Sequence, residues 1–288
     1  MTTALPREAP MPRLGPTRWD ELRLRLHSLN RGWFNLSMLR RRHYDGAVCS
    51  MKNTGTHWVK YMLGLLLAEL YQLPPPEHLG SKEIIGHPKQ PPLYRQIPQI
   101  VSSHSAAHHL LHYPVVTRLC HFPRYVVVVR DIREILVSYY EKWHGAGEAS
   151  FSDYLRGRAS TRRFSGDLWE FIRYLNSWAP IVAAQPELAT VLRYEDLKAD
   201  PPAELMRIAT HLGIQGVSAE LARRVVAQAS KEQMAKRLDP DEDRFERVIN
   251  FGERRAVDWF AEADRRYFTA ALERTLQCDY GYDFADWA

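Results

Sequence analysis

Residues 125–140 read YVVVVRDIREILVSYY, and this stretch decides the fold class. Four consecutive valines with no polar residue between them are typical of a strand that is buried on both faces at the centre of a parallel sheet. Arg130 and Asp131 follow at the carboxyl end of this strand, and the segment IREILVSYYEKW then predicts a helix. A buried strand, a polar turn and a helix together predict a βαβ unit.

The same order of strand, turn and helix recurs on both sides of this stretch. Three more strands are predicted at AVCSM, QIVSS and ATVLR, which are residues 47–51, 99–103 and 189–193. Helices are expected between them, and a further helix is expected over residues 218–236. This alternation predicts a single α/β domain whose central, mostly parallel sheet is flanked by helices. Ligands of such sheets bind at the carboxyl ends of the strands.

Composition and charge limit the class of protein without identifying it. The chain has 288 residues, of which 45% are hydrophobic and 25% charged, as in an ordinary globular domain. A net charge of +5 fits an anionic ligand, a membrane surface or nucleic acid and does not choose among them. The three scattered cysteines, Cys49, Cys120 and Cys278, predict neither a disulfide framework nor a zinc site, and they favour a reducing, cytoplasmic location.

The amino-terminal part changes character near residue 18. Residues 1–17 are proline-rich and aperiodic, so we expect a disordered tail, followed by one domain over residues 18–288. Within residues 18–42, leucines recur near helical spacing among arginines, and Asn30 and Gly32 are expected to divide this helix into two pieces. We prefer a helix packed on the core; the alternative is a helix that lies on an anionic membrane.

The segment after the first predicted strand, KNTGTHW, leads directly into a helix. Unpaired backbone N–H groups and the helix dipole make such a helix start suitable for binding a phosphate. Gly55 allows close approach of an oxyanion, and Thr54 and Thr56 add hydroxyl donors. An ordinary capped helix explains the local pattern as well, and the spacing of the nucleotide-triphosphate P-loop is absent.

This segment resembles the first signature of the PAPS-dependent sulfotransferases, in which a strand is followed by P-K-S/T-G-T-T-W and a helix. Thr54, Gly55, Thr56 and Trp58 match that signature, with His57 between the last two. The resemblance implies a P-loop-like segment that cradles the 5′-phosphosulfate of PAPS. It also implies that Trp58 stacks on the adenine of this donor.

The chain departs from this signature at the catalytic lysine. The family lysine, which bridges the leaving oxygen and the sulfuryl group, aligns with Asn53, and Lys52 stands in the place of the family proline. Three alternatives follow: Lys52 turns inward and takes the role, Asn53 takes it with a neutral amide, or another cation replaces it.

The stretch that decides the fold also resembles the second signature of the family, R-N-P-x-D-x-x-x-S-Y-Y at the end of a strand. Arg130 and Ser138 match in register, and Glu134 stands for the family aspartate. An arginine at a strand end can contact a phosphate through two charge-assisted hydrogen bonds. The resemblance implies that Arg130 and Ser138 hold the 3′-phosphate of PAPS.

A histidine follows the strand at residues 99–103, and the segment resembles the family's strand ending in K-T-H. The resemblance implies that His104 is the general base that takes the proton of the acceptor hydroxyl. An imidazole can do this at neutral pH without a shifted pKa. The family lysine two residues earlier is Ser102. No metal site is expected at the nearby histidines, because no carboxylate or cysteine has ligand spacing.

Two carboxyl-terminal segments extend the resemblance, which covers about residues 45–275. The sequence VLRYEDLKADP resembles the family's strand followed by Y-E-D-L-x-x-D-P, which implies that Tyr194 contacts the adenine. The loop that closes over the 3′-phosphate in the family is matched only in part, by Asp258 and Trp259. Arg254 and Arg255 are the candidates for its phosphate clamp.

The resemblance implies a five-stranded sheet and transfer of a sulfuryl group from PAPS to a hydroxyl acceptor, or an amine, by in-line attack without a metal. The alternative is a protein that binds PAP or PAPS without catalysis, and an NTP-dependent phosphotransferase is weaker still. The acceptor is a small molecule, a lipid or a glycan, and residues 74–98 and 144–168 are expected to line its pocket. We expect no nucleic-acid partner, and a homodimer remains open.

Overall fold

The computed structural model describes residues 15–33, 43–143, 149–158, 166–238 and 255–287. Its centre is a five-stranded sheet with the order β2-β3-β1-β4-β5, and every neighbouring pair is parallel. This confirms the predicted α/β class and the parallel sheet. The strands are β1 (Gly46–Ser50), β2 (Ile85–Gly86), β3 (Ile100–Ser103), β4 (Arg124–Val129) and β5 (Ala189–Arg193).

The strand order places β1 at the point where the direction of winding changes. The chain moves from β1 to β2 at one edge and returns through β3, which pairs with β1. It then crosses to β4 on the other side of β1 and ends the sheet at β5. Such a reversal opens a crevice at the carboxyl ends of the central strands, where ligands of α/β sheets bind.

The sheet separates two hydrophobic cores, and β4 contributes to both. Tyr125, Val127 and Val129 face one core, and Val126 and Val128 face the other, all with 0% of their surface exposed. Successive side chains of a strand point to opposite faces of a sheet. The run of valines therefore reflects burial on both faces, as the sequence predicts.

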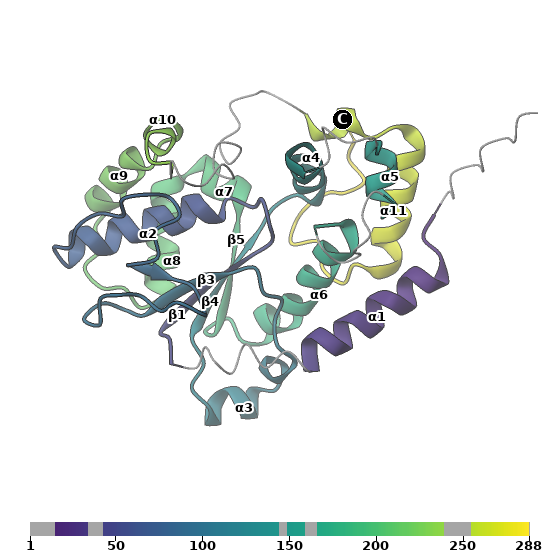
Figure 1. Cartoon of the computed structure of the whole chain (residues 1–288). Helices are drawn as coiled ribbons and strands as arrows, with labels where there is room; N and C mark the ends of the chain where they lie inside the picture. Colours follow the sequence, from purple (N-terminus) through teal and green to yellow (C-terminus); the bar gives the residue numbers. More distant parts are fainter. Residues whose placement is uncertain (1–14, 34–42, 144–148, 159–165, 239–254, 288) are drawn as a thin grey trace, which may run out of the picture.

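Helices cover the two faces as separate layers (Figure 1). The layer on one face contains α2 (Thr56–Leu70), α8 (Pro201–His211) and α9 (Ala219–Gln228), with the short α7 (Tyr194–Ala199) and α10 (Lys231–Ala235). The opposite layer contains α1 (Arg18–Trp33), α4 (Ile132–Trp143), α5 (Phe151–Leu155), α6 (Leu168–Ala184) and α11 (Glu262–Thr275). Two 3₁₀ helices, η2 (His109–His112) and η3 (Ala256–Trp259), and the short helix α3 (Pro114–Leu119) complete the described elements.

Three local predictions need correction. α1 runs without a break through Asn30 and Gly32 to Trp33, since one glycine costs a helix only about 1 kcal/mol relative to alanine. The helix expected over residues 218–236 is two helices, because the side chain of Ser230 accepts a hydrogen bond from the amide of Gln233 and caps a new helix, α10. The two-residue strand β2 was not predicted.

Residues 1–14 of the expected tail lie outside the described residues. Residues 34–42 of the segment 18–42 lie outside them as well. At the start of α1, the backbone N–H of Thr17 donates to a carboxylate oxygen of Asp20 at 2.9 Å. The boundary between tail and domain therefore remains a prediction. Among the helices that the structure describes, none is both long and apolar enough to cross a bilayer.

Candidate active site

The loop between β1 and α2 has the backbone shape of an anion-binding turn. Asn53 and Gly55 have positive φ angles of 58° and 80°, and Gly55 is the N-cap residue of α2. Asparagine tolerates this left-handed conformation better than most residues, whereas glycine has no steric penalty there. The hydroxyl of Thr54 donates to the carbonyl of Met51 at 2.7 Å and fixes the turn. The first amides of α2 therefore face the carboxyl end of the sheet.

Arg130 lies against this loop, as its position at the end of β4 predicts. One guanidinium nitrogen donates to the carbonyl of Asn53 at 3.1 Å, and another pairs with Glu134 at 3.1 Å. The guanidinium carbon lies 4.5 Å from the ring centre of Tyr194. That ring also packs on Gly55, where an added Cβ would lie 2.7 Å from it. Three segments that are distant in sequence thus meet at one site.

Three buried N–H donors of this cluster have no hydrogen-bond partner among the described residues. They are Nδ2 of Asn53, Nε1 of Trp58 and Nε of Arg130. The ring of Trp58 lies edge-on to that of Tyr194, with 6.3 Å between the ring centres. Buried polar groups are normally paired, because an unpaired one costs about 1–3 kcal/mol. A ligand with several anionic oxygens would satisfy these donors, so the cluster fits a nucleotide phosphate.

His104 begins the loop after β3 and is tied to β1 through Ser50. Its Nδ1 lies 3.2 Å from the carbonyl oxygen of Ser50 and 3.2 Å from its hydroxyl. The Ser50 hydroxyl is in turn 2.7 Å from that of Thr56. A carbonyl can only accept, so this contact favours a proton on Nδ1 and a lone pair on Nε2. The arrangement can hold His104 as a base that is directed away from the sheet.

His104 is exposed, and its Nδ1 edge contacts the end of β1 at Ser50. Burial among these atoms lowers the pKa of His104 below its usual 6.5, and the positive charge of Lys52 lowers it further. The contact with the Ser50 carbonyl and the negative charge of Glu170 act in the opposite direction. The lowered pKa keeps His104 neutral, and so able to accept a proton, at pH 7.

Lys52 and His104 line the same cleft. The ammonium of Lys52 lies 3.4 Å from a carboxylate oxygen of Glu170 and 5.6 Å from the ring centre of Tyr139. The same oxygen of Glu170 accepts the amide N–H of Gly166. The cleft is lined by Met51, Lys52, His104, Glu170, Phe171, Arg173 and Tyr174. Lys52 therefore turns towards the side of His104, whereas the side chain of Asn53 is buried in the loop.

His57 and Ser138 occupy the two helices that border the loop. His57 lies on the first turn of α2, where burial, and then the charge of Lys60, lowers its pKa to about 4. This histidine is neutral at pH 7 and adds no charge to the site. Ser138 is half-buried on α4, two turns beyond Arg130.

The carboxyl-terminal segment reaches the same region through α4. Arg255 is exposed and precedes η3, and the amide of the next residue, Ala256, donates to a carboxylate oxygen of Glu134 at 3.3 Å. Since Glu134 also pairs with Arg130, Arg255 lies on a segment connected to the predicted phosphate site. Arg254 lies outside the described residues.

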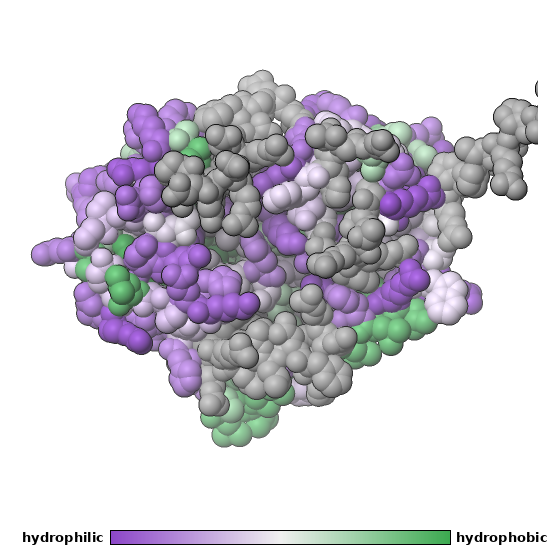
Figure 2. Space-filling model, in the orientation of Figure 1, coloured by the Kyte–Doolittle hydropathy of each residue, from purple (hydrophilic) through white to green (hydrophobic). Residues whose placement is uncertain are grey.

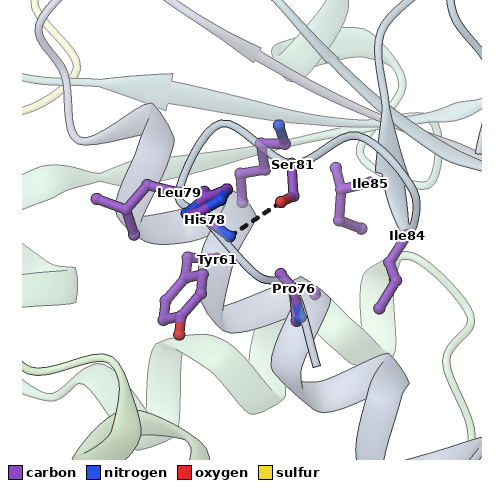
Figure 3. A pocket seen from close by; sticks show the side chains of 9 residues that line it. Tyr61, Pro76, His78, Leu79, Ser81, Ile84 and Ile85 are labelled. Atoms are coloured by element: carbon purple, nitrogen blue, oxygen red, sulfur yellow. Dashed lines mark hydrogen bonds between the residues drawn. The ribbon is translucent and has the colours of Figure 1, made fainter. Parts of the chain in front are cut away.

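A second cavity lies between α2 and the loop that follows it (Figure 3). Tyr61, Pro76, Ile84 and Ile85 line it, and across it the backbone N–H of His78 donates to the hydroxyl of Ser81 at 3.0 Å. None of the predicted site residues lines this cavity. Residues of the segment 74–98 and of α2 line it together, and the role of that segment in an acceptor pocket stays a prediction.

Two residues of the site, Ser50 and Glu170, belong to no sequence motif. Ser50 is the last residue of β1 and has 0% of its surface exposed; a serine ending an apolar strand was the one available signal. Glu170 is on the first turn of α6, just after the segment 144–168 that was expected to line the acceptor pocket. Residues 144–148 and 159–165 lie outside the described residues. In the part of the chain that is described, no group of three metal-ligating side chains is present.

Fold and site define an α/β protein in which a loop with the backbone shape of an anion-binding turn lies at the switch point of the parallel sheet. Residues 44–287 match the family model of the sulfotransferase domain, and the chain therefore belongs to the sulfotransferase family. This confirms the family resemblance of the sequence. Comparison with curated protein sequences gave no match.

Solved structures with the same fold include a mouse sulfotransferase, SULT7A1, complexed with PAP. That structure is 15% identical, with a TM-score of 0.57 over 87% of this chain and 93% of the other. Retinol dehydratase is similar in two complexes, one with androsterone and the inactive cofactor PAP and one with retinol and PAP. Both are 16% identical with a TM-score of 0.55, and they cover 90% and 91% of this chain and 87% and 88% of the other.

Proposed function

We propose that this protein transfers a sulfuryl group from PAPS to a hydroxyl group of a small acceptor. The observation that carries the proposal is the joint placement of two features at one edge of the sheet. One is the loop with its three unpartnered buried donors, and the other is His104, connected to that loop through the hydroxyls of Ser50 and Thr56. Membership of the sulfotransferase family supports the reaction type.

The donor would lie along the loop and over β4. Backbone amides at the start of α2, with Thr54 and Thr56, would bind its 5′ end, where the transferred group is attached. Arg130 and Ser138, with Arg255 from the opposite side, would bind the 3′-phosphate. Trp58 and Tyr194 lie beside each other and offer ring surfaces to the adenine. The complexes of the mouse sulfotransferase and of retinol dehydratase with PAP support this choice of ligand.

His104 would act as the general base. Its Nε2 would accept the proton of the acceptor hydroxyl while the hydroxyl oxygen attacks sulfur, and the bond from sulfur to the phosphate oxygen would break on the opposite side. The Nδ1 proton would stay on His104 and donate to the carbonyl of Ser50 during this step, so the new imidazolium charge would be stabilised by an acceptor that is already in place. An amine could replace the hydroxyl in its neutral form.

Lys52 is the better candidate for the cation that the family lysine supplies. Its ammonium lies in the same cleft as His104 and would supply positive charge to the group being transferred. Nδ2 of Asn53 would then be a neutral donor to the phosphosulfate. The alternative, PAP or PAPS binding without catalysis, is motivated by the residues Asn53 and Ser102 at two positions where the family has lysine.

The acceptor is proposed to be a small molecule that enters the cleft at His104. Tyr174 and Phe171 give this cleft apolar surface, and its charged side chains are those of Lys52, Glu170 and Arg173. The bound retinol and androsterone in the retinol dehydratase complexes support an acceptor of this size. Lipid and glycan acceptors belong in the same assay panel.

The test compares His104→Ala with His109→Ala in a PAPS-dependent transfer assay over phenols, steroids, sugars and lipids. His109 is a matched control because it lies five residues further along the same segment, on η2, and stacks on His112. We expect His104→Ala to lower turnover by about 100-fold or more with unchanged PAP affinity, and His109→Ala to retain activity. PAP binding without transfer to any acceptor by the wild-type protein would favour the binding-protein alternative.

A further inference from the structure

α1 presents its apolar side chains on the outer surface of the protein. Trp19, Leu22, Leu26 and Leu29 follow each other at intervals of three or four residues, so they share one helix face. Their side chains are 70%, 43%, 57% and 54% exposed, whereas Leu24 on the opposite face is 6% exposed. The face that carries Trp19, Leu22, Leu26 and Leu29 is therefore not the face that packs on the core, and it is called the α1 stripe below.

The orientation of α1 is fixed by contacts of its inner face. Glu21 forms an ion pair with Arg274 of α11 at 2.5 Å, and Arg274 also donates to the carbonyl of Pro16 at 3.0 Å. Residues of α1 also pack against α6 and η2. The stripe is consequently held outward by the folded protein. α1 does pack on the core through Leu24, as preferred from the sequence, while its other apolar residues face outward.

α3 adds a second exposed apolar surface on the same side. Tyr113, Val115 and Leu119 are 44%, 66% and 81% exposed, and η2 contacts both α3 and α1. Figure 2 shows hydrophobic surface along the lower edge of the molecule at two places, over α1 and over α3. Exposed apolar patches of this kind mark interaction surfaces in soluble domains.

Arginines border the stripe. Each residue turns the helix by about 100°, which places Arg23 on one side of the stripe and Arg18 and Arg25 on the other. All three are exposed. The acidic residues of the same helix are engaged elsewhere, since Asp20 accepts from Thr17 and Glu21 pairs with Arg274. The outer face of α1 is thus apolar in the middle and positive at its margins.

We propose that the α1 stripe, together with α3, docks this protein on the surface of an anionic lipid bilayer. Tryptophan and leucine would enter the boundary between headgroups and acyl chains, and the bordering arginines would pair with anionic headgroups, as in interfacial helices. A second copy of the chain fits this surface less well, because a symmetric contact would bring the same arginines together. The proposal does not depend on the proposed sulfuryl transfer.

Vesicle co-sedimentation tests the proposal with the full chain. The probes are vesicles of phosphatidylcholine alone and vesicles of phosphatidylcholine and phosphatidylserine in equal parts. The stripe variant carries Trp19→Gln and Leu26→Gln, and its control is Leu93→Gln, a leucine with 67% exposure outside α1 and α3. The charge variant is Arg23→Ser, and its control is Arg223→Ser, an exposed arginine on α9.

Wild-type protein is expected to bind the anionic vesicles and to stay in solution with phosphatidylcholine alone. The stripe variant should lose affinity by about tenfold or more, and Arg23→Ser by about fivefold. Both controls should bind like wild type, and unchanged melting temperatures show that the variants fold. Failure of the wild type to bind anionic vesicles would overturn the proposal. Equal losses of vesicle affinity in Arg23→Ser and Arg223→Ser would also overturn it. A third contrary outcome is a wild-type protein that binds no vesicles but forms a dimer, if the stripe variant abolishes that dimer.

Discussion

Arg130 offers the sharpest test of the donor site, because its guanidinium reaches the phosphate loop, α4 and Tyr194 at once. If it binds the 3′-phosphate, Arg130→Ala removes two charge-assisted hydrogen bonds, each of about 1.5–3 kcal/mol. Part of this is offset, because Arg130 is already paired with Glu134 at 3.1 Å in the protein without nucleotide. We therefore take a loss near the lower limit, about 3 kcal/mol, which is a rise of about 100-fold in the Kd for PAP.

Isothermal calorimetry with PAP at fixed ionic strength measures this change. Arg124→Ala is the matched control, because Arg124 is exposed at the opposite end of the same strand and donates to the carbonyl of His211 at 3.1 Å. Arg124→Ala should leave the Kd unchanged. A Kd for Arg130→Ala within error of the wild-type value, or equal losses in the two variants, would refute the placement of the nucleotide at β4.

Three further changes probe the site. Lys52→Met should lower kcat by about 100-fold. Because Lys52 lowers the pKa of His104, this substitution should also move the acidic limb of the pH profile of kcat/KM to higher pH. An acidic limb that does not move would contradict the placement of Lys52 and His104 in one cleft. Glu170→Gln should move the same limb to lower pH, since Glu170 raises that pKa; a shift to higher pH counts against this contact. Gly55→Ala should cost about 1–3 kcal/mol in urea unfolding, because φ is 80° and a Cβ would lie 2.7 Å from the ring of Tyr194; unchanged stability would show that the loop is relaxed.

The strands that sequence predicted are those whose residues are buried on both faces. β4 is the strongest case, because each of its valines lies in one of the two cores and none can be replaced by a polar residue without cost. β2 has two residues in a proline-rich segment and is recognised only through its pairing with β3. A pattern of hydrophobicity cannot reveal a strand that short, since two residues span a single period of the alternation.

The division of the expected helix at residues 218–236 has a similar explanation. Ser230 reads as an ordinary polar residue within a helical pattern, but its hydroxyl competes for the backbone and caps a new helix. In α1 the reverse holds: the sequence predicts a break at Asn30 and Gly32, but the helix continues through both residues to Trp33. Local propensities of about 1 kcal/mol do not decide such cases, because contacts from other parts of the chain have the same magnitude.

For the site, the sequence selected residues that carry their own local signal. Gly55, Arg130 and His104 each end a predicted strand or begin a helix, and the structure brings them to one edge of the sheet. Ser50 and Glu170 were missed, because their roles consist of contacts with residues 54 and 118 positions away. No local pattern encodes such contacts.

The sequence by itself therefore determined the α/β class, the family and the residues at the carboxyl ends of the strands. Strands that are buried on both faces appear as apolar runs, and the starts of helices carry local motifs, so both can be recognised without the structure. Only the tertiary structure decided which way the side chains turn. Lys52 turns to the cleft of His104 and Asn53 into the loop, and the stripe of α1 faces outward. These choices depend on which partner is nearest in space, and the distances between partners are fixed only when the sheet and its two helical layers have packed.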